Sequence, residues 1–207
     1  MGVTLAGTKL QKLFNWRVIF RDISFDVSQG QTLLVTGRNG SGKSTLVKII
    51  SGVLTPTSGK VTIAAEGHGG DDARADLVGL VSPYLQMYDE FSARENIQYA
   101  LAIRGRRVDG GWIDDLLAQV GLFERRNDAV RTYSSGMKQR VKYAFALVHR
   151  PPVLLLDEPT ANLDSEGITV VRDIMARQRS EGILVVATND LSDIDHYDLR
   201  VDLNVKS

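Results

Sequence analysis

The segment that most constrains this chain is Gly37-Arg-Asn-Gly-Ser-Gly-Lys43-Ser44-Thr45, which matches the pattern G-x-x-x-x-G-K-[S/T]. It follows Thr32–Thr36, a short apolar stretch typical of a buried strand, and residues 43–51 after it read as a helix closed by Gly52. Such a loop surrounds phosphate groups with backbone N–H groups, and the helix N-terminus adds partial positive charge. The residues expected to contact a nucleotide are Gly37, Asn39, Gly40, Ser41, Gly42, Lys43, Ser44 and Thr45.

A second apolar segment, residues 153–156, ends in the acidic pair Asp157-Glu158. An acidic pair after a strand often caps a helix, but a phosphate loop earlier in the same chain favours a catalytic role. Asp157 suits a magnesium ligand opposite Ser44, and Glu158 suits a group that orients and polarises an attacking water. The pattern therefore predicts Lys43 and Glu158 as catalytic residues, with Ser44 and Asp157 as ligands of Mg²⁺.

Strands and helices alternate toward both ends of the chain. Residues 23–27 and 60–64 alternate apolar and polar side chains, as half-exposed strands do. Residues 165–180 read as a helix and residues 183–187 as a buried strand. This alternation predicts an α/β fold with a mostly parallel sheet and an antiparallel β edge built from the N-terminal strands.

The middle of the chain is helical instead. Ser92-Ala-Arg-Glu95 has the pattern of a capping box, and one apolar helical face ends at Gly121. That face consists of Trp112, Ile113, Leu116, Leu117 and Val120. We expect a single domain over residues 1–207, with a core of residues 1–83 and 151–207 and an inserted helical subdomain at about 84–150. Residues 66–72 read as a polar loop.

Composition excludes several classes of protein. Lysine plus arginine equals aspartate plus glutamate at 25 each, and this balance argues against a nucleic-acid partner. The chain has no cysteine, which excludes disulfides and thiolate metal sites, and its 3 histidines are scattered. No apolar run reaches the ~18 residues of a transmembrane helix, and the N-terminus lacks the apolar core of a signal peptide. We expect a soluble cytosolic protein unless a partner holds it at a membrane.

The segment Tyr133-Ser134-Ser135-Gly136-Met-Lys-Gln-Arg140 leads into a predicted helix. A serine hydroxyl, glycine N–H groups and a helix N-terminus are good donors to an anion, although a simple Ser-capped helix is the alternative. The segment resembles the signature of ABC ATPases, usually Leu-Ser-Gly-Gly-Gln, and residues 161–164 resemble that family's D-loop. The resemblance implies a RecA-like P-loop core of ABC type. It also implies that Ser134 and Gly136 cap the γ phosphate bound by another subunit.

Three further positions follow from the resemblance. Phe14 matches the aromatic residue that stacks on adenine in the family. Trp16 is the alternative for this stacking role. For either ring, packing in the hydrophobic core stays open. In the family, a glutamine in a segment called the Q-loop lies near the metal. The matching position here is Pro83, so either Gln86 takes that role or the contact is missing. Asn189 stands where the family usually has histidine, in the context Thr188-Asn189-Asp190. We expect Asn189 to act in catalysis with a weakened contact to the γ phosphate.

The resemblance also implies partners and location. The expected protein binds and hydrolyses ATP with Mg²⁺, as a homodimer or as a heterodimer with a second ATPase subunit. It binds integral-membrane permease subunits at the cytoplasmic face of the inner or plasma membrane. The signature and the short length look most similar to the ATPase of the haem exporter in cytochrome c maturation. Two alternatives are an ATP-dependent dimerisation switch with weak hydrolysis and a soluble non-transport ABC ATPase; one domain without heptads argues against the second.

Overall fold

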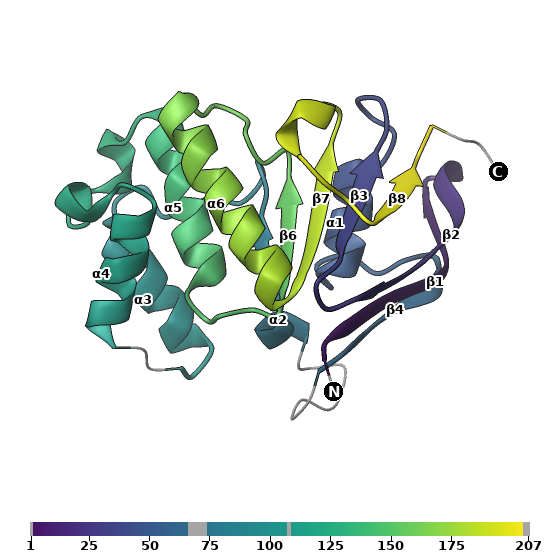
Figure 1. Cartoon of the computed structure of the whole chain (residues 1–207), viewed down its shortest axis with the longest axis horizontal. Helices are drawn as coiled ribbons and strands as arrows, with labels where there is room; N and C mark the ends of the chain where they lie inside the picture. Colours follow the sequence, from purple (N-terminus) through teal and green to yellow (C-terminus); the bar gives the residue numbers. More distant parts are fainter. Residues whose placement is uncertain (1, 66–73, 107–108, 205–207) are drawn as a thin grey trace.

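The computed structural model describes residues 2–65, 74–106 and 109–204, so the predicted polar loop at 66–72 lies outside the described residues. Its two β-sheets are visible in Figure 1. The larger sheet has five parallel strands in the order β5 (Val78–Val81), β6 (Val153–Asp157), β7 (Ile183–Thr188), β3 (Thr32–Thr36) and β8 (Leu199–Asp202). The smaller sheet is antiparallel, in the order β2 (Arg17–Ser28), β1 (Thr4–Phe14) and β4 (Ser58–Ala64).

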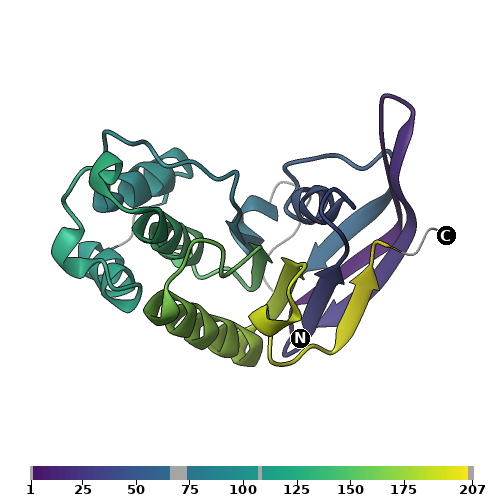
Figure 2. The ribbon, with the colours of Figure 1, turned by 90° about the horizontal axis from the view of Figure 1, so that it is seen from above.

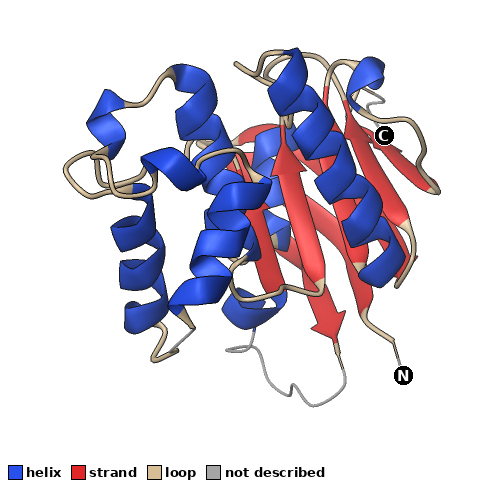
Figure 3. Cartoon of the chain, turned by 60° about the vertical axis from the view of Figure 1, so that its left-hand side comes forward, coloured by secondary structure: helices blue, strands red, loops and turns tan. Residues whose placement is uncertain are grey.

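Helices pack against the parallel sheet, and further helices lie beside it at one end of the molecule, as the colouring by secondary structure in Figure 3 shows. The helices are α1 (Lys43–Ile50), α2 (Arg74–Leu77), α3 (Ala93–Ile103), α4 (Gly110–Gln119), α5 (Ser135–Leu147) and α6 (Ser165–Glu181). Short 3-10 helices span Phe123–Arg125, Val130–Thr132 and Leu191–Asp193. Within the described ranges, no helix is both long and apolar enough to cross a membrane.

Two apolar clusters lie on opposite faces of the parallel sheet because successive side chains of a strand point to opposite faces. Leu33 and Val35 of β3 join the cluster that contains α1 and the antiparallel sheet. Leu34, between them, joins the cluster that contains α3, α4, α5 and α6. All three side chains are fully buried, and burying a leucine or valine side chain contributes about 1.5–3 kcal/mol.

The helical region lies between β5 and β6 in the sequence, where the residues predicted an insertion. Its first long helix, α3, begins with the predicted capping box. The Ser92 hydroxyl accepts from the Glu95 backbone N–H at 3.2 Å, and the Ser92 N–H donates to the Glu95 carboxylate at 2.8 Å. The apolar residues predicted on one helical face, from Trp112 to Leu117, lie on α4. The exact boundaries at 84 and 150 stay a prediction.

The parallel arrangement brings one end of several strands to the same edge. Thr36 pairs with Thr188, Asp157 with Ala187, and Val81 with Leu156. The residues that follow β3, β5, β6 and β7 therefore meet at the carboxyl edge of the sheet, where open α/β sheets bind their ligands.

Candidate functional site

The loop from Gly37 to Gly42 connects β3 to α1 and has the backbone of a phosphate loop. Gly42 immediately precedes α1 and has φ 107°, in the left-handed region that glycine adopts readily. A Cβ at Gly42 would lie 2.5 Å from the Ile19 side chain, so a larger residue does not fit there. The loop therefore presents backbone N–H groups at the start of a helix, as anion binding requires.

Lys43 is the first residue of α1 and connects the phosphate loop to the end of β6. Its Nζ donates to the Gly37 carbonyl at 2.9 Å and lies 3.4 Å from Oε1 of Glu158. The lysine side chain is 6% exposed, and that of Glu158 is 30% exposed. The structure thus brings together Lys43 and Glu158, two of the three residues that the sequence predicted as catalytic.

Asp157 ends β6 and is buried. Burial raises the pKa of its carboxyl above the ordinary value, whereas the nearby Ser44 and Ser82 hydroxyls and the charge of Lys43 act in the opposite direction. The Ser82 hydroxyl lies 3.3 Å from Oδ2 of Asp157, whereas Oδ1 has no partner among the described residues. A buried carboxylate oxygen without a partner, beside a serine hydroxyl, fits a hard divalent cation such as Mg²⁺.

A network of hydroxyl groups lies behind Glu158. The Thr188 hydroxyl lies 3.5 Å from Oε2 of Glu158 and also donates to the carboxylate of Asp193. The same carboxylate accepts a hydrogen bond from the Thr160 hydroxyl. Asp193 is 6% exposed. This network joins the segment after β6, the end of β7 and Glu158.

The two positions that depart from the family pattern differ in their surroundings. Asn189, directly after β7, donates through its side-chain amide to the side-chain oxygen of Asn39 at 3.1 Å. Gln86 is exposed in the loop after β5. The catalytic role of Asn189 and the metal-ligand role of Gln86 stay predictions.

The two aromatic rings near the β1–β2 turn are exposed: Phe14 is 45% exposed and Trp16 is 94% exposed. The alternative of a core role is therefore wrong for both. The ammonium group of Lys12 lies 4.8 Å from the centroid of the Phe14 ring. Adenine stacking on Phe14 stays a prediction.

The segment that resembles the signature caps α5. The Ser134 hydroxyl accepts from the Met137 N–H at 3.2 Å, and a Cβ at Gly136 would lie 3.1 Å from the Asn162 carbonyl oxygen. The signature therefore lies against the segment that resembles the D-loop. Tyr133, which replaces the usual leucine, is buried, and its hydroxyl donates to the Arg125 carbonyl at 2.6 Å.

The signature caps α5 and the phosphate loop precedes α1, and these two helices belong to different parts of the fold. Figures 1 and 2 agree that α5 belongs to the helical region at one end, whereas α1 lies beyond β6 and β7 toward the antiparallel sheet. The helix that the signature caps is therefore not the helix that begins with Lys43.

Sequence reasoning missed Ser82, Thr160 and Asp193. Ser82 follows β5, whose four residues Val-Gly-Leu-Val give too short a pattern to indicate a strand on their own. A polar residue at the end of a buried parallel strand is the signal that could have identified Ser82 once β5 was recognised. Asp193 lies in a short 3-10 helix, and no sequence pattern connects it to Thr160.

Comparison with known proteins finds ABC transporter ATP-binding proteins among those similar to this chain. The family model described as "ABC transporter" matches residues 20–161. The uncharacterized ABC transporter ATP-binding protein YdbJ of Bacillus subtilis is 36% identical over 195 residues, which is 93% of this chain and 63% of that protein. The lantibiotic transport ATP-binding protein SrtF of Streptococcus pyogenes is 33% identical over 190 residues, or 90% of this chain and 80% of SrtF.

A solved structure shows the same fold. The structure described as the dimeric structure of MJ0796, a bacterial ABC transporter cassette, has a TM-score of 0.80 at 24% identity, and the match covers 91% of this chain and 89% of that one. The chain spans about two thirds or less of several relatives, as with YdbJ at 63%. The match of the family model over more than half of the chain, together with this fold, shows that the chain belongs to the ABC transporter family and has the fold of its ATP-binding cassette.

Proposed function

We propose that this chain is the ATP-binding and ATP-hydrolysing subunit of an ABC transporter. The observation that carries the proposal is the convergence of Lys43, Asp157 and Glu158 at the carboxyl edge of the parallel sheet. Lys43 and the phosphate loop bind the β and γ phosphates. Glu158 holds the attacking water and polarises it.

Ser44 and Asp157 are the residues that would hold Mg²⁺. When bound, the cation neutralises charge on the phosphate oxygens and orients them. Oδ1 of Asp157, which has no partner within the described part of the chain, supports this assignment. Phe14 is proposed to stack on adenine, and Gln86 is proposed to reach the metal from the loop after β5.

The working unit that we propose is a head-to-tail dimer, formed by two copies or by this chain and a second ATPase subunit. Because the signature caps α5 whereas Lys43 begins α1, Ser134 and Gly136 are proposed to cap the nucleotide of the partner. The dimeric MJ0796 cassette supports this arrangement. Contacts to the γ phosphate then favour the closed dimer, whereas ADP lacks them.

The proposed partners are integral-membrane permease subunits, which would hold the chain at the cytoplasmic face of the membrane. An exposed aromatic cluster at the start of the helical region supports such a contact. The ring of Tyr88 lies 5.4 Å from those of Phe91 and Tyr99, and all three side chains are more than a third exposed. Exposed aromatic rings of this kind are typical of protein interfaces.

Haem export is the more specific proposal, and its support is the likeness of the signature at residues 133–140. The name of SrtF concerns lantibiotic transport, a different cargo. Purification of the chain from native membranes, with the co-purifying membrane protein identified by mass spectrometry, tests both the partner and the class of cargo. Recovery without any multi-spanning protein would contradict the transport proposal.

Steady-state phosphate release from ATP and Mg²⁺ by the purified chain tests the enzymatic part of the proposal. The second candidate function is a switch that binds ATP and dimerises with weak hydrolysis, and the hydrogen bond between Asn189 and Asn39 favours it. ATP-dependent dimerisation without phosphate release, even with the membrane partner present, would support the switch and exclude the ATPase.

A further inference from the structure

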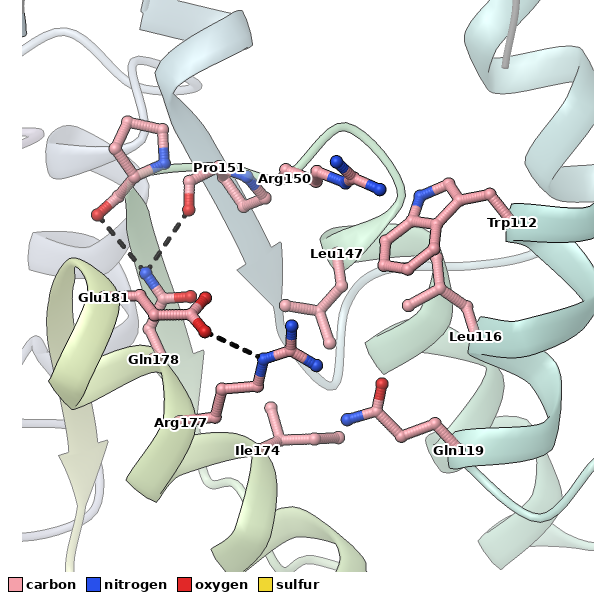
Figure 4. Close-up of a pocket in the computed structure, with 11 residues that line it drawn as sticks. Trp112, Leu116, Gln119, Leu147, Arg150, Pro151, Ile174, Arg177, Gln178 and Glu181 are labelled. Carbon is pink, nitrogen blue, oxygen red and sulfur yellow. Dashed lines mark hydrogen bonds and ion pairs between the residues drawn. The ribbon is translucent and has the colours of Figure 1, made fainter. Parts of the chain in front are cut away.

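A cavity of about 460 Å³ lies at the amino end of β6, whereas the candidate site lies at the carboxyl end of the same strand (Figure 4). Its walls come from α4, from α6, from the end of α5 and from the loop that joins α5 to β6. The volume is within the range of sites that bind small organic molecules. None of the residues assigned above to nucleotide binding lines this cavity.

The apolar part of the cavity lining comes from several helices and includes one flat ring. It consists of Trp112 and Leu116 of α4, Leu147 of α5 and Ile174 of α6. The indole N–H of Trp112 donates to the Val148 carbonyl at 2.9 Å, so the ring is held in one orientation. A ring fixed in this way is a preorganised wall for an apolar ligand.

The charged groups of the cavity are two arginines and one glutamate. Figure 4 shows the Arg177 guanidinium and the Gln119 amide pointing toward the middle of the cavity. The Arg177 guanidinium lies 3.1 Å from the Glu181 carboxylate, and that of Arg150 lies 4.3 Å from the Trp112 ring. Two cations and one carboxylate leave the lining with one net positive charge. Gln178 is already engaged, since its amide donates to the backbone of the α5–β6 loop.

We propose that this cavity binds a small organic anion that has a flat apolar body and a single carboxylate or sulfonate group. The body packs against Trp112 and Leu116, and the acidic group binds the guanidinium of Arg177, which exchanges Glu181 for the ligand. Because α4 and α6 both line the cavity, the ligand contacts the helical region and the α/β core at once. The proposal does not depend on ATP hydrolysis.

The test uses two dyes with the same apolar body. 8-Anilinonaphthalene-1-sulfonate carries the sulfonate, and N-phenyl-1-naphthylamine lacks it. The chain has 2 tryptophans, so Trp16→Phe leaves Trp112 as the sole tryptophan reporter. We expect the sulfonate dye to quench Trp112 emission saturably with one equivalent bound, and the uncharged dye to bind about tenfold more weakly.

Three variants in the Trp16→Phe background separate this cavity from other surfaces. Arg177→Gln should weaken binding of the sulfonate dye about tenfold, and Glu181→Gln should strengthen it because Arg177 is released. Arg172→Gln removes an arginine from the same helix outside the cavity and should change nothing. Circular dichroism checks that each variant is folded. Equal binding of both dyes, equal binding by the Arg177 and Arg172 variants, or bound dye that leaves Trp112 emission unchanged would overturn the proposal.

Discussion

The side-chain amide of Asn189 donates a hydrogen bond of 3.1 Å to the side-chain oxygen of Asn39, which attaches the end of β7 to the phosphate loop. The donor of Asn189 is therefore engaged within the protein. Histidine, the usual residue of the family at this position, has a longer side chain and can carry a positive charge. The difference bears directly on how the γ phosphate is stabilised during hydrolysis.

We therefore predict that Asn189→His raises the rate of ATP hydrolysis by about tenfold or more, because one well-placed donor contributes a factor of about 100 or more in other enzymes. ATP affinity should change little. Steady-state phosphate release measures the rate, and Asn127→His, at an exposed position in the helical region, is the control for an added histidine. An equal or lower rate in the Asn189 variant would show that asparagine is adapted to its role.

Lys43→Ala should weaken ATP binding by about a hundredfold or more, which would abolish it at ordinary ATP concentrations. The reason is that the phosphates lose a buried cation and its charge-assisted hydrogen bonds. Isothermal titration calorimetry measures the affinity. The control is Lys60→Ala on β4, which removes an exposed lysine and should leave affinity unchanged. Unchanged ATP affinity in a folded Lys43 variant would contradict the assignment of the phosphate loop.

Glu158→Gln should bind ATP and accumulate as a dimer, because an amide keeps the shape of the side chain but cannot accept a proton from water. Gel filtration with light scattering should show a larger species with ATP and Mg²⁺ than with ADP. Glu166→Gln, the same change at an exposed position on α6, should not trap the dimer. A Glu158 variant that remains monomeric at saturating ATP would contradict a dimer that is stable without the membrane subunits.

Asp193→Asn should lower the rate of hydrolysis about tenfold without changing ATP affinity. The buried carboxylate accepts from the hydroxyls of Thr160 and Thr188, and Thr188 also contacts Glu158. An amide at 193 disturbs this network and so the position of Glu158, whereas it leaves the phosphate loop intact. Phosphate release and calorimetry separate the two effects, with Asp195→Asn as the exposed control. Equal losses in affinity and rate would indicate a merely structural role for Asp193.

The stability of the chain should fall in mild acid because of His149. Burial lowers the pKa of this histidine from 6.5 to about 4, and the charge of Arg104 acts in the same direction. The unfolded chain therefore binds the proton more readily than the folded chain, and stability is lost as the pH falls from 6.5 toward 4.

Between pH 7 and pH 5 this single group should lower the free energy of unfolding by about 2 kcal/mol. His149→Gln keeps a donor for the Val78 carbonyl, which the ring nitrogen contacts at 3.1 Å, and does not titrate. Chemical denaturation at the two pH values should show a smaller loss in the variant. The same loss in both proteins would assign the acid sensitivity to other groups.

The sequence predicted those parts of the molecule whose structure is determined by residues close together in the chain. The phosphate loop, the strand that ends at Asp157 and the capping box of Ser92 each depend on residues close together in the chain. Strands β5 and β8 have four residues each, too few for a periodic pattern to distinguish them. The contact between Asn39 and Asn189 joins residues 150 positions apart, and only the register of β3 beside β7 brings them together.

The apolar cluster on one face of the parallel sheet does not stop at the edge of the helical region. It joins residues of α3, α4 and α5 with residues of β6, β7 and α6, among them Ile97, Leu116, Leu154 and Val186. Removing either part would expose apolar side chains that the other part covers. We therefore expect the chain to melt in one cooperative transition, and residues 84–150 expressed alone to remain unfolded.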